Sequence, residues 1–112
     1  MKKILVPTDF SDLAGYAGEV AAELAPLFNA EVHFFHRVHM PPNWNKMTDL
    51  EQLDFPEIQA RIRSVKHRFT ELKKDLEPAR VGITTSFGGG HLIENIASYI
   101  DHEGVQMIIM GS

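Results

Sequence analysis

The residues of this 112-residue chain that could hold a ligand follow two of its apolar runs. Pro7-Thr8-Asp9 comes directly after Ile4-Leu5-Val6, and Gly88-Gly89-Gly90 follows an alternating run. Asp9 could accept hydrogen bonds from a ribose or a ligand amine, or it could cap the turn into the next helix. The glycine amides could cradle an anion, or they could form a tight turn. The residues alone leave both alternatives open at each position.

The sequence excludes several kinds of catalytic and metal site. The chain has no cysteine, so thiolate metal sites, cysteine nucleophiles and disulfides are absent. It lacks the glycine motifs of P-loops and dinucleotide-binding folds, and the nucleophile elbow of serine hydrolases. His33, His36 and His39 suggest a metal cluster, but on a strand His36 points away from the other two, which would lie about 20 Å apart. We therefore expect no metal site and no catalytic residue.

Apolar periodicity places the candidate residues at the ends of predicted strands. Strand-like runs at 4–6, 31–38, 81–87 and 105–110 alternate with three helical patterns. The first helix follows a predicted N-cap at Ser11, the second carries an apolar stripe over 58–76, and the third ends at Gly104. The connection 39–55 has no period and contains two adjacent prolines. We expect it to be poorly ordered or only locally structured.

The spacing of apolar residues also predicts which side chains of two helices face the sheet. In the first helix the predicted face consists of Leu13, Ala17, Val20, Leu24 and Phe28, with alanines beside them that allow a close approach. In the third helix it consists of Leu92, Ile93, Ile96, Ala97 and Ile100.

Strands that alternate with helices predict an α/β fold with an open, doubly wound parallel sheet. Ligands of such sheets bind beyond the carboxyl ends of the strands, where the strand order reverses. The residues predicted to bind a ligand at that edge are Pro7, Thr8, Asp9, Val38, Met110, Gly111 and Ser112.

Length and composition predict one ordinary globular domain. Apolar residues make up 44% of the chain and charged residues 23%, and the net charge is -4. An acidic balance argues against non-specific binding to nucleic acid or to anionic membranes. The apolar run near the N-terminus is too short for a signal peptide, and no run is long enough for a spanning helix. We therefore expect a soluble, cytoplasmic protein.

Three segments together resemble the universal stress protein (UspA-like) family. Residues 2–11 (KKILVPTDFS) resemble its opening strand and turn, residues 31–36 (EVHFFH) its second strand, and residues 107–112 (MIIMGS) its fourth strand. The resemblance implies a five-stranded parallel sheet in the order 3-2-1-4-5. It also implies that ATP-binding members hold the nucleotide between strands one and four, with a glycine-rich loop around the ribose and phosphates.

The resemblance assigns roles to particular residues of this chain. Pro7, Thr8 and Asp9 would lie at the adenine and ribose, and Met110 and Gly111 would flank the same pocket. Where the family commonly has a valine against the adenine, this chain has Arg37. Val38 would take that role only with a shift of one residue.

A second departure from the family pattern concerns the C-terminal part. The chain ends at Ser112, before the rest of the glycine loop, the fifth strand and the last helix. We therefore expect a single domain over 1–112 that is incomplete at its C-terminus, with its visible strands in the order 3-2-1-4. The complete domain could bind ATP as its cofactor, whereas the 112-residue chain is expected to bind ATP weakly or not at all.

Two functions from different classes follow. The first is a regulatory stress-response module that binds ATP when complete. The alternative is a family member that binds no nucleotide and acts through dimerisation or protein interaction. An enzyme has little support, with at most weak ATP hydrolysis in the complete protein. Residues 105–110 would form an edge strand, so the expected partner is a second copy of the chain or a tandem second domain, and neither nucleic acid nor membrane.

Overall fold

A computed structural model of the chain describes residues 2–41 and 43–111. Its strands are β1 (Lys2–Pro7), β2 (Ala30–Arg37), β3 (Ile83–Gly88) and β4 (Val105–Ile108). They form one sheet in the order β3-β2-β1-β4, and each neighbouring pair is parallel. The predicted doubly wound α/β fold and the strand order 3-2-1-4 are therefore confirmed. β4 stops two residues before the end of its predicted run, and its register against β1 shifts between Lys3 and Ile4.

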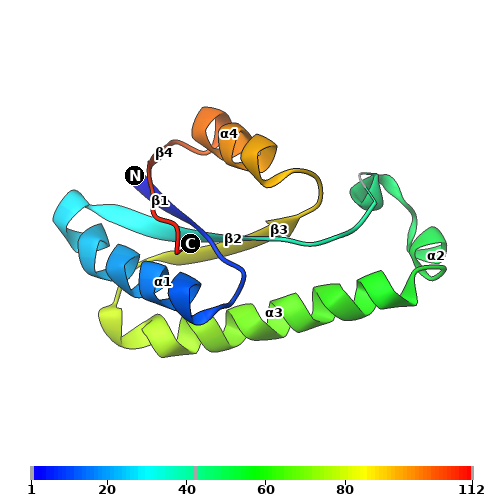
Figure 1. Cartoon of the computed structure of the whole chain (residues 1–112), viewed down its shortest axis with the longest axis horizontal. Helices are drawn as coiled ribbons and strands as arrows, with labels where there is room; N and C mark the ends of the chain where they lie inside the picture. The colour runs from blue at the N-terminus through cyan, green and yellow to red at the C-terminus, as the bar shows by residue number, and fades with distance from the viewer. Residues whose placement is uncertain (1, 42, 112) are drawn as a thin grey trace.

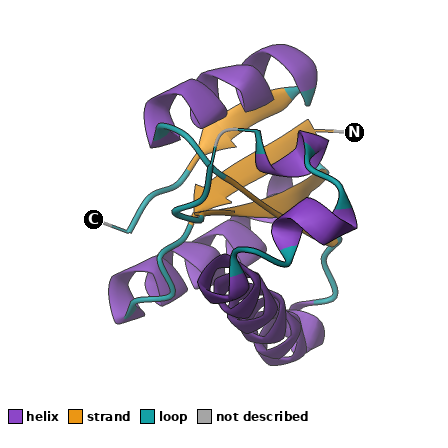
Figure 2. Cartoon of the chain, turned by 90° about the vertical axis from the view of Figure 1, so that its right-hand side faces the viewer, coloured by secondary structure: helices purple, strands orange, loops and turns teal. Residues whose placement is uncertain are grey.

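Three helices cover the two faces of the sheet unequally. α1 (Asp12–Leu24) and α3 (Pro56–Leu76) lie on one face, and α4 (Leu92–His102) lies on the other, as Figures 1 and 2 show. The remaining turns are short: η1 (Ala25–Phe28), η2 (Trp44–Lys46), α2 (Asp49–Gln52) and η3 (Glu77–Ala79). Within the described ranges, no helix is both long enough and apolar enough to cross a membrane.

Local sequence signals explain where the helices begin and end. Ser11 caps α1 by accepting a hydrogen bond from the backbone N–H of Ala14, as predicted. Pro56 stands at the start of α3, where its missing N–H costs nothing. Gly104 follows α4 with a φ of 69°, a left-handed conformation that glycine adopts without strain. These signals set the residues at which the helices begin and end, and therefore the length of the connections between strands.

The predicted face of α1 is confirmed in part: Ala17 and the alanines beside it are buried, whereas most of its large apolar residues are exposed. Its buried residues are small: Ala14, Ala17, Gly18, Ala21 and Ala22. A Cβ on Gly18 would lie 3.0 Å from Cε1 of Phe34, so a larger side chain has no room there. Leu13 is 59% exposed and Val20 is 45% exposed, and both were predicted to be buried. The prediction placed large apolar side chains at the centre of this face, whereas the short distance between helix and sheet selects the small residues beside them.

The buried face of α4 is also partly different from the prediction. The residues that pack against Leu5 and Phe35 of the sheet are Leu92, Ile96 and Tyr99. Ile93 and Ile100, which were predicted to be buried, are 81% and 47% exposed. Tyr99 takes their place because its ring lies edge-on to Phe35 and its hydroxyl hydrogen-bonds to Ser86. A half-buried tyrosine with a partner for its hydroxyl satisfies both the apolar and the polar part of its side chain.

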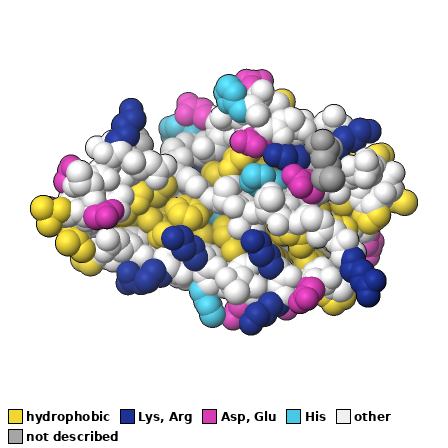
Figure 3. All heavy atoms as spheres, turned by 180° about the vertical axis from the view of Figure 1, so that it is seen from behind, with side chains coloured by type: hydrophobic (Ala, Val, Ile, Leu, Met, Phe, Trp, Pro, Cys, Tyr) yellow, Lys and Arg dark blue, Asp and Glu magenta, His cyan; other side chains and the backbone are white. Residues whose placement is uncertain are grey.

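The long connection after β2 contains only short elements, in agreement with the prediction of local structure. α2 begins with a capping box formed by Thr48 and Glu51. Trp44 is buried, and its ring lies edge-on to that of Phe55. Figure 3 shows hydrophobic side chains gathered over the end of the molecule that carries α2, where Leu50 is exposed.

Candidate functional site

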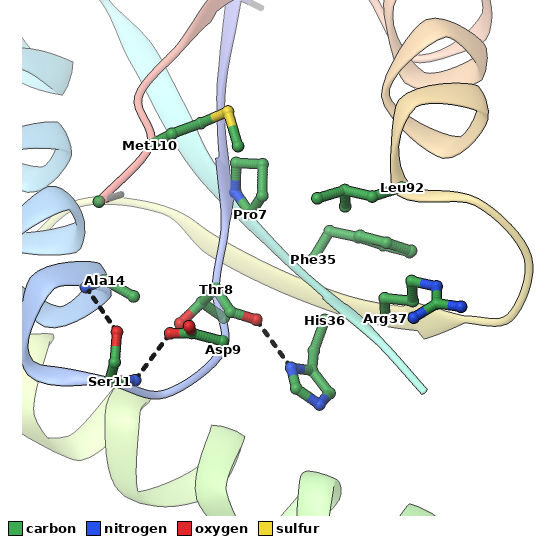
Figure 4. Close-up of a pocket in the computed structure, with 11 residues that line it drawn as sticks. Pro7, Thr8, Asp9, Ser11, Ala14, Phe35, His36, Arg37, Leu92 and Met110 are labelled. Atoms are coloured by element: carbon green, nitrogen blue, oxygen red, sulfur yellow. Dashed lines mark hydrogen bonds between the residues drawn. The ribbon is translucent and has the colours of Figure 1, made fainter. Parts of the chain in front are cut away.

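A pocket lies at the carboxyl ends of β1 and β2, beside the segment that follows β4. Its volume is about 260 Å³, slightly below the roughly 300–1,000 Å³ of typical ligand pockets. It is lined by Pro7, Thr8, Asp9, Ser11, Ala14, Phe35, His36, Arg37, Leu92, Met110 and Gly111 (Figure 4). The strand order reverses at β1, so this is the position at which open α/β sheets bind their ligands.

Most residues predicted to bind a ligand line this pocket, namely Pro7, Thr8, Asp9, Met110 and Gly111. Val38 does not line it, because its side chain is buried in the core between the sheet and α3. Arg37 lines the pocket instead, since neighbouring residues at the end of a strand point to opposite faces. Ser112 lies outside the described residues.

Side-chain hydrogen bonds fix the turn that leads from β1 into α1. The hydroxyl of Thr8 accepts a hydrogen bond from the backbone N–H of Phe10 at 3.1 Å. The Asp9 carboxylate accepts one from the N–H of Ser11 at 2.9 Å. Phe10 has a φ of 63°, a left-handed conformation that costs energy in a residue with a side chain. The turn is thus held in one shape at the edge of the pocket.

Asp9 is both a turn residue and an ionised group facing solvent. Hydrogen bonding to the Ser11 side chain, and then to its backbone N–H, holds the pKa of Asp9 below its usual value. The carboxylate is therefore charged at neutral pH. Asp9 is exposed, so its carboxylate can also accept hydrogen bonds from a ligand. The two sequence interpretations of Asp9 are compatible.

His36 joins the end of β2 to the turn after β1. Its Nδ1 lies 2.7 Å from the backbone oxygen of Thr8, and because a carbonyl only accepts, Nδ1 carries the proton. Its ring packs 4.7 Å from that of Phe10. Figure 4 shows the hydrogen bond between His36 and Thr8. Sequence analysis had considered His36 only as a metal ligand and as part of a family motif, because nothing in the chain reveals this contact across the sheet.

The turn after β3 uses its glycine carbonyl oxygens to hold the chain together. The oxygen of Gly88 accepts from the N–H of Val38 at 2.8 Å, and that of Gly89 accepts from Nδ2 of Asn95 at 2.9 Å. The oxygen of Gly90 accepts from Nε of Arg37. Gly90 has a φ of 84°. This arrangement agrees with the tight-turn interpretation of the three glycines, and it positions Arg37 at the rim of the pocket.

Gly111 closes the pocket on the side of α1. A Cβ built on it would lie 2.3 Å from the backbone oxygen of Leu13, far inside any van der Waals contact. The chain after β4 can therefore approach the first turn of α1 only because residue 111 has no side chain. This close approach brings Gly111, and Met110 before it, into the lining of the same pocket as Asp9.

The three histidines that suggested a metal cluster do not lie together. His33 is buried under α4, where its Nε2 lies 2.9 Å from the hydroxyl oxygen of Ser86, whereas His36 points to the opposite face toward Phe10. Burial lowers the pKa of His33. Within residues 2–41 and 43–111, no group of three or more histidine, aspartate or glutamate side chains could hold a metal ion.

The apolar walls of the pocket are contributed by residues that sequence analysis missed. Phe35 and Leu92 stand beside Pro7 in the lining. The one signal for Phe35 is its place two residues before Arg37 on the same face of β2, and Leu92 could be found only once α4 was placed. Apolar walls can hold a flat ring, and an ionised carboxylate at the rim can accept hydrogen bonds from hydroxyl groups attached to that ring system.

Comparisons with known proteins found a matching family model and similar solved structures. The model of the universal stress protein family matches residues 1–112. The structure of universal stress protein UspA from Lactobacillus plantarum is 19% identical, with 97% of this chain and 75% of that chain covered and a TM-score of 0.75. The structure of hypothetical protein MJ0577 is 28% identical, with 97% and 73% covered and a TM-score of 0.75.

A third solved structure was determined with a ligand. A universal stress protein in complex with cAMP is 18% identical, with 96% of this chain and 69% of that chain covered and a TM-score of 0.61. A search of curated proteins found no significant match.

Proposed function

Because this chain belongs to the universal stress protein family, we propose that it is a regulatory stress-response module whose pocket binds the adenosine part of a nucleotide. The observation that carries the proposal is the combination, in one pocket at the strand switch point, of apolar walls and the ionised carboxylate of Asp9. The complex of a relative with cAMP supports an adenine nucleotide as the ligand. The proposal thus assigns a ligand-binding site, made of named residues, to this member of the family.

The lining residues fit an adenosine. Pro7, Phe35 and Leu92 would pack against the base, since flat apolar rings bind best between apolar side chains. Asp9 would accept hydrogen bonds from the ribose hydroxyls with its exposed carboxylate.

The proposal is tested by calorimetric titration of the chain with adenosine and with cAMP. Asp9→Asn keeps an oxygen that can accept from Ser11 but removes the charge, and it should weaken adenosine binding by about tenfold. Asp12→Asn is the matched control, because Asp12 is exposed in the first turn of α1 and does not line the pocket. Unchanged affinity in Asp9→Asn would contradict the proposal.

We infer that the output of this module is regulatory rather than catalytic. The polar groups nearest the base are used to hold the turn: the Thr8 hydroxyl accepts from Phe10, and His36 donates to the oxygen of Thr8. The unprotonated Nε2 of His36 makes no hydrogen bond to a hydroxyl group in the described part of the chain, so no nucleophile is paired with this base there. Sustained ATP hydrolysis that is lost in His36→Gln would contradict this inference.

A second candidate function, association with another chain, is favoured by a separate observation. Among the described strands, β4 pairs only with β1, so its other edge has no strand beside it. α1 and η1 carry exposed apolar side chains, and Gly111, which follows β4, lies against the backbone of one of them, Leu13. These side chains are Leu13, Tyr16, Val20, Leu27 and Phe28. Unpaired edges and contiguous apolar patches are typical of association surfaces. We propose that a second copy of the chain binds here.

A further inference from the structure

A second hollow lies between the end of β2 and α3, and its lining contains no acidic side chain. Its volume is about 230 Å³. It is lined by Phe10, His36, Arg37, Val38, His39, Arg61, Ser64, Val65 and Arg68. Only His36 and Arg37 also line the pocket described above. In a chain with a net charge of -4, such a concentration of positive charge is unexpected.

The spacing of residues along α3 builds one wall of this hollow. Arg61, Ser64 and Arg68 are three and four residues apart, which puts them in one row along the helix. Residues 58–70 contain Arg61, Arg63, Lys66 and Arg68 and no aspartate or glutamate. Figure 3 shows Lys and Arg side chains gathered along α3. The helix thus offers two guanidinium groups and a hydroxyl group to a ligand from one side.

The two guanidinium groups are oriented without any carboxylate. Nη1 of Arg61 donates to the backbone oxygen of His39 at 3.2 Å, and Cζ of Arg68 lies 5.4 Å from the centre of the Phe10 ring. Although Arg68 also borders a hollow that contains Glu71 and Asp75, no carboxylate lies within 4.0 Å of Arg61 or Arg68 in the described part of the chain. Most of their N–H donors are therefore left for a ligand.

The histidines face α3 from the end of β2. The Nδ1 of His36 is engaged with Thr8, which fixes the ring in place against Phe10. His39 is held through its backbone oxygen by Arg61. Two imidazole rings therefore lie across the hollow from the two guanidinium groups. The planar forks of two arginines match the several oxygens of a phosphate group better than they match a halide or a single carboxylate.

We propose that this hollow is a phosphate-binding site, in which Arg61 and Arg68 bind the oxygens of one phosphate group and Ser64 donates a third hydrogen bond. The ligand class is a phosphomonoester or a polyphosphate. The proposal goes beyond the adenosine pocket and does not depend on it, because Arg61, Ser64 and Arg68 do not line that pocket. The phosphate comes either from a separate molecule or from a nucleotide held next door.

The test is calorimetric titration of the whole chain with sodium pyrophosphate at low ionic strength. The double variant Arg61→Gln/Arg68→Gln should bind pyrophosphate at least about tenfold more weakly, because the loss of one charge-assisted hydrogen bond alone lowers the affinity by about that factor. Arg63→Gln is the matched control, because Arg63 belongs to the same cationic run but lies outside the hollow. It should bind pyrophosphate as the unaltered chain does.

Two further measurements complete the test. Amide resonances of Ser64 and Arg68 should shift on adding pyrophosphate to the unaltered chain, a result that needs no variant to fold. Arg68→Lys should recover only part of the affinity, because an ammonium cannot make the bidentate contact. No pyrophosphate binding by the unaltered chain, or equal weakening in Arg63→Gln, would overturn the proposal.

Titration with adenosine and with ATP identifies the source of the phosphate. Adenosine should bind the double variant and the unaltered chain equally, so failure of the adenosine pocket and failure of this site give different results. If the double variant also loses ATP affinity, the phosphate belongs to a nucleotide; if ATP affinity is unchanged, it belongs to a separate molecule. Either result supports the site, provided that pyrophosphate binding is lost.

Discussion

Gly111 lies so close to the backbone of α1 that it has no room for a side chain. Gly111→Ala would place a Cβ 2.3 Å from the oxygen of Leu13, so the segment after β4 or the first turn of α1 must move. Forced displacements of this kind cost about 1–3 kcal/mol. Urea unfolding should show a loss of that size, and the loss should be accompanied by weaker adenosine binding because the pocket wall moves.

Gly15→Ala is the control for that substitution. Gly15 lies inside α1, and a Cβ there would meet nothing within 4 Å. Alanine favours a helix over glycine by about 1 kcal/mol, so this variant should be more stable than the unaltered chain. Equal stability changes in the two variants would show that the contact with Leu13 is not formed in solution.

His33 makes the stability of the chain dependent on pH. Burial, and then the nearby charge of Lys3, lowers the pKa of His33, although Glu103 and Glu31 oppose the shift. In the unfolded chain a histidine has a pKa of about 6.5. As pH falls below that value, the unfolded state binds a proton that the folded state refuses, so the folded state loses stability.

The measurement for His33 combines titration with unfolding. NMR titration should give His33 a midpoint below about 6.5, and urea unfolding should show a free energy that decreases as the pH is lowered through the window beneath that value. His33→Gln cannot take up this proton and should flatten that dependence. A midpoint at or above the ordinary value would contradict the burial seen under α4.

At the scale of one element, α1 shows that size decides which side of a helix meets a sheet. Ala21 is fully buried, whereas Val20 beside it is exposed. Ala21→Leu should destabilise the fold by about 1–3 kcal/mol because the sheet leaves no space, while Val20→Leu should change stability by less than about 0.5 kcal/mol. Thermal unfolding of both variants checks this. A larger loss in Val20→Leu would mean that the helix is rotated.

The elements and their order could be predicted from the sequence, but the faces of two helices could not. Alternating periods in the apolar pattern predicted the four strands and three long helices. Hydrophobicity predicted burial for Leu13 and Ile93, which are exposed, and it overlooked Tyr99. Those outcomes depend on the spacing between layers and on a partner for the tyrosine hydroxyl, and both are set by tertiary structure.

Part of the candidate site could also be predicted from the sequence, and part could not. Topology alone placed Thr8, Asp9 and Gly111 at one edge of the sheet, where they line one pocket. Phe35 joins them because of the pleat of β2. The bond of His36 to the oxygen of Thr8 could not be predicted, since it depends on how two strands are staggered. Their binding roles stay predictions until ligands are titrated.

At the scale of the whole molecule, β4 has an edge without a described strand beside it, and α1 and η1 carry exposed apolar side chains. If a second copy binds there, sedimentation across a dilution series should show a dimer that dissociates on dilution. Leu13→Lys should weaken the dimer, because Leu13 is exposed beside the chain that follows β4. Leu50→Lys is the control, since Leu50 is equally apolar and exposed but lies in α2. A monomer at high micromolar concentration would contradict the proposal.

The order of strands in the sheet also bears on how the chain is made. β1 is synthesised first, yet the two strands that flank it are β2, which follows soon, and β4, which begins only at Val105. At about 5–20 residues per second, the ribosome needs roughly 3–14 s to pass from the end of β2 to the start of β4. During that interval one edge of β1, including its apolar Ile4-Leu5-Val6, has no partner from its own chain. A nascent-chain chaperone would therefore act most usefully on this N-terminal strand, between the release of β2 and the arrival of β4.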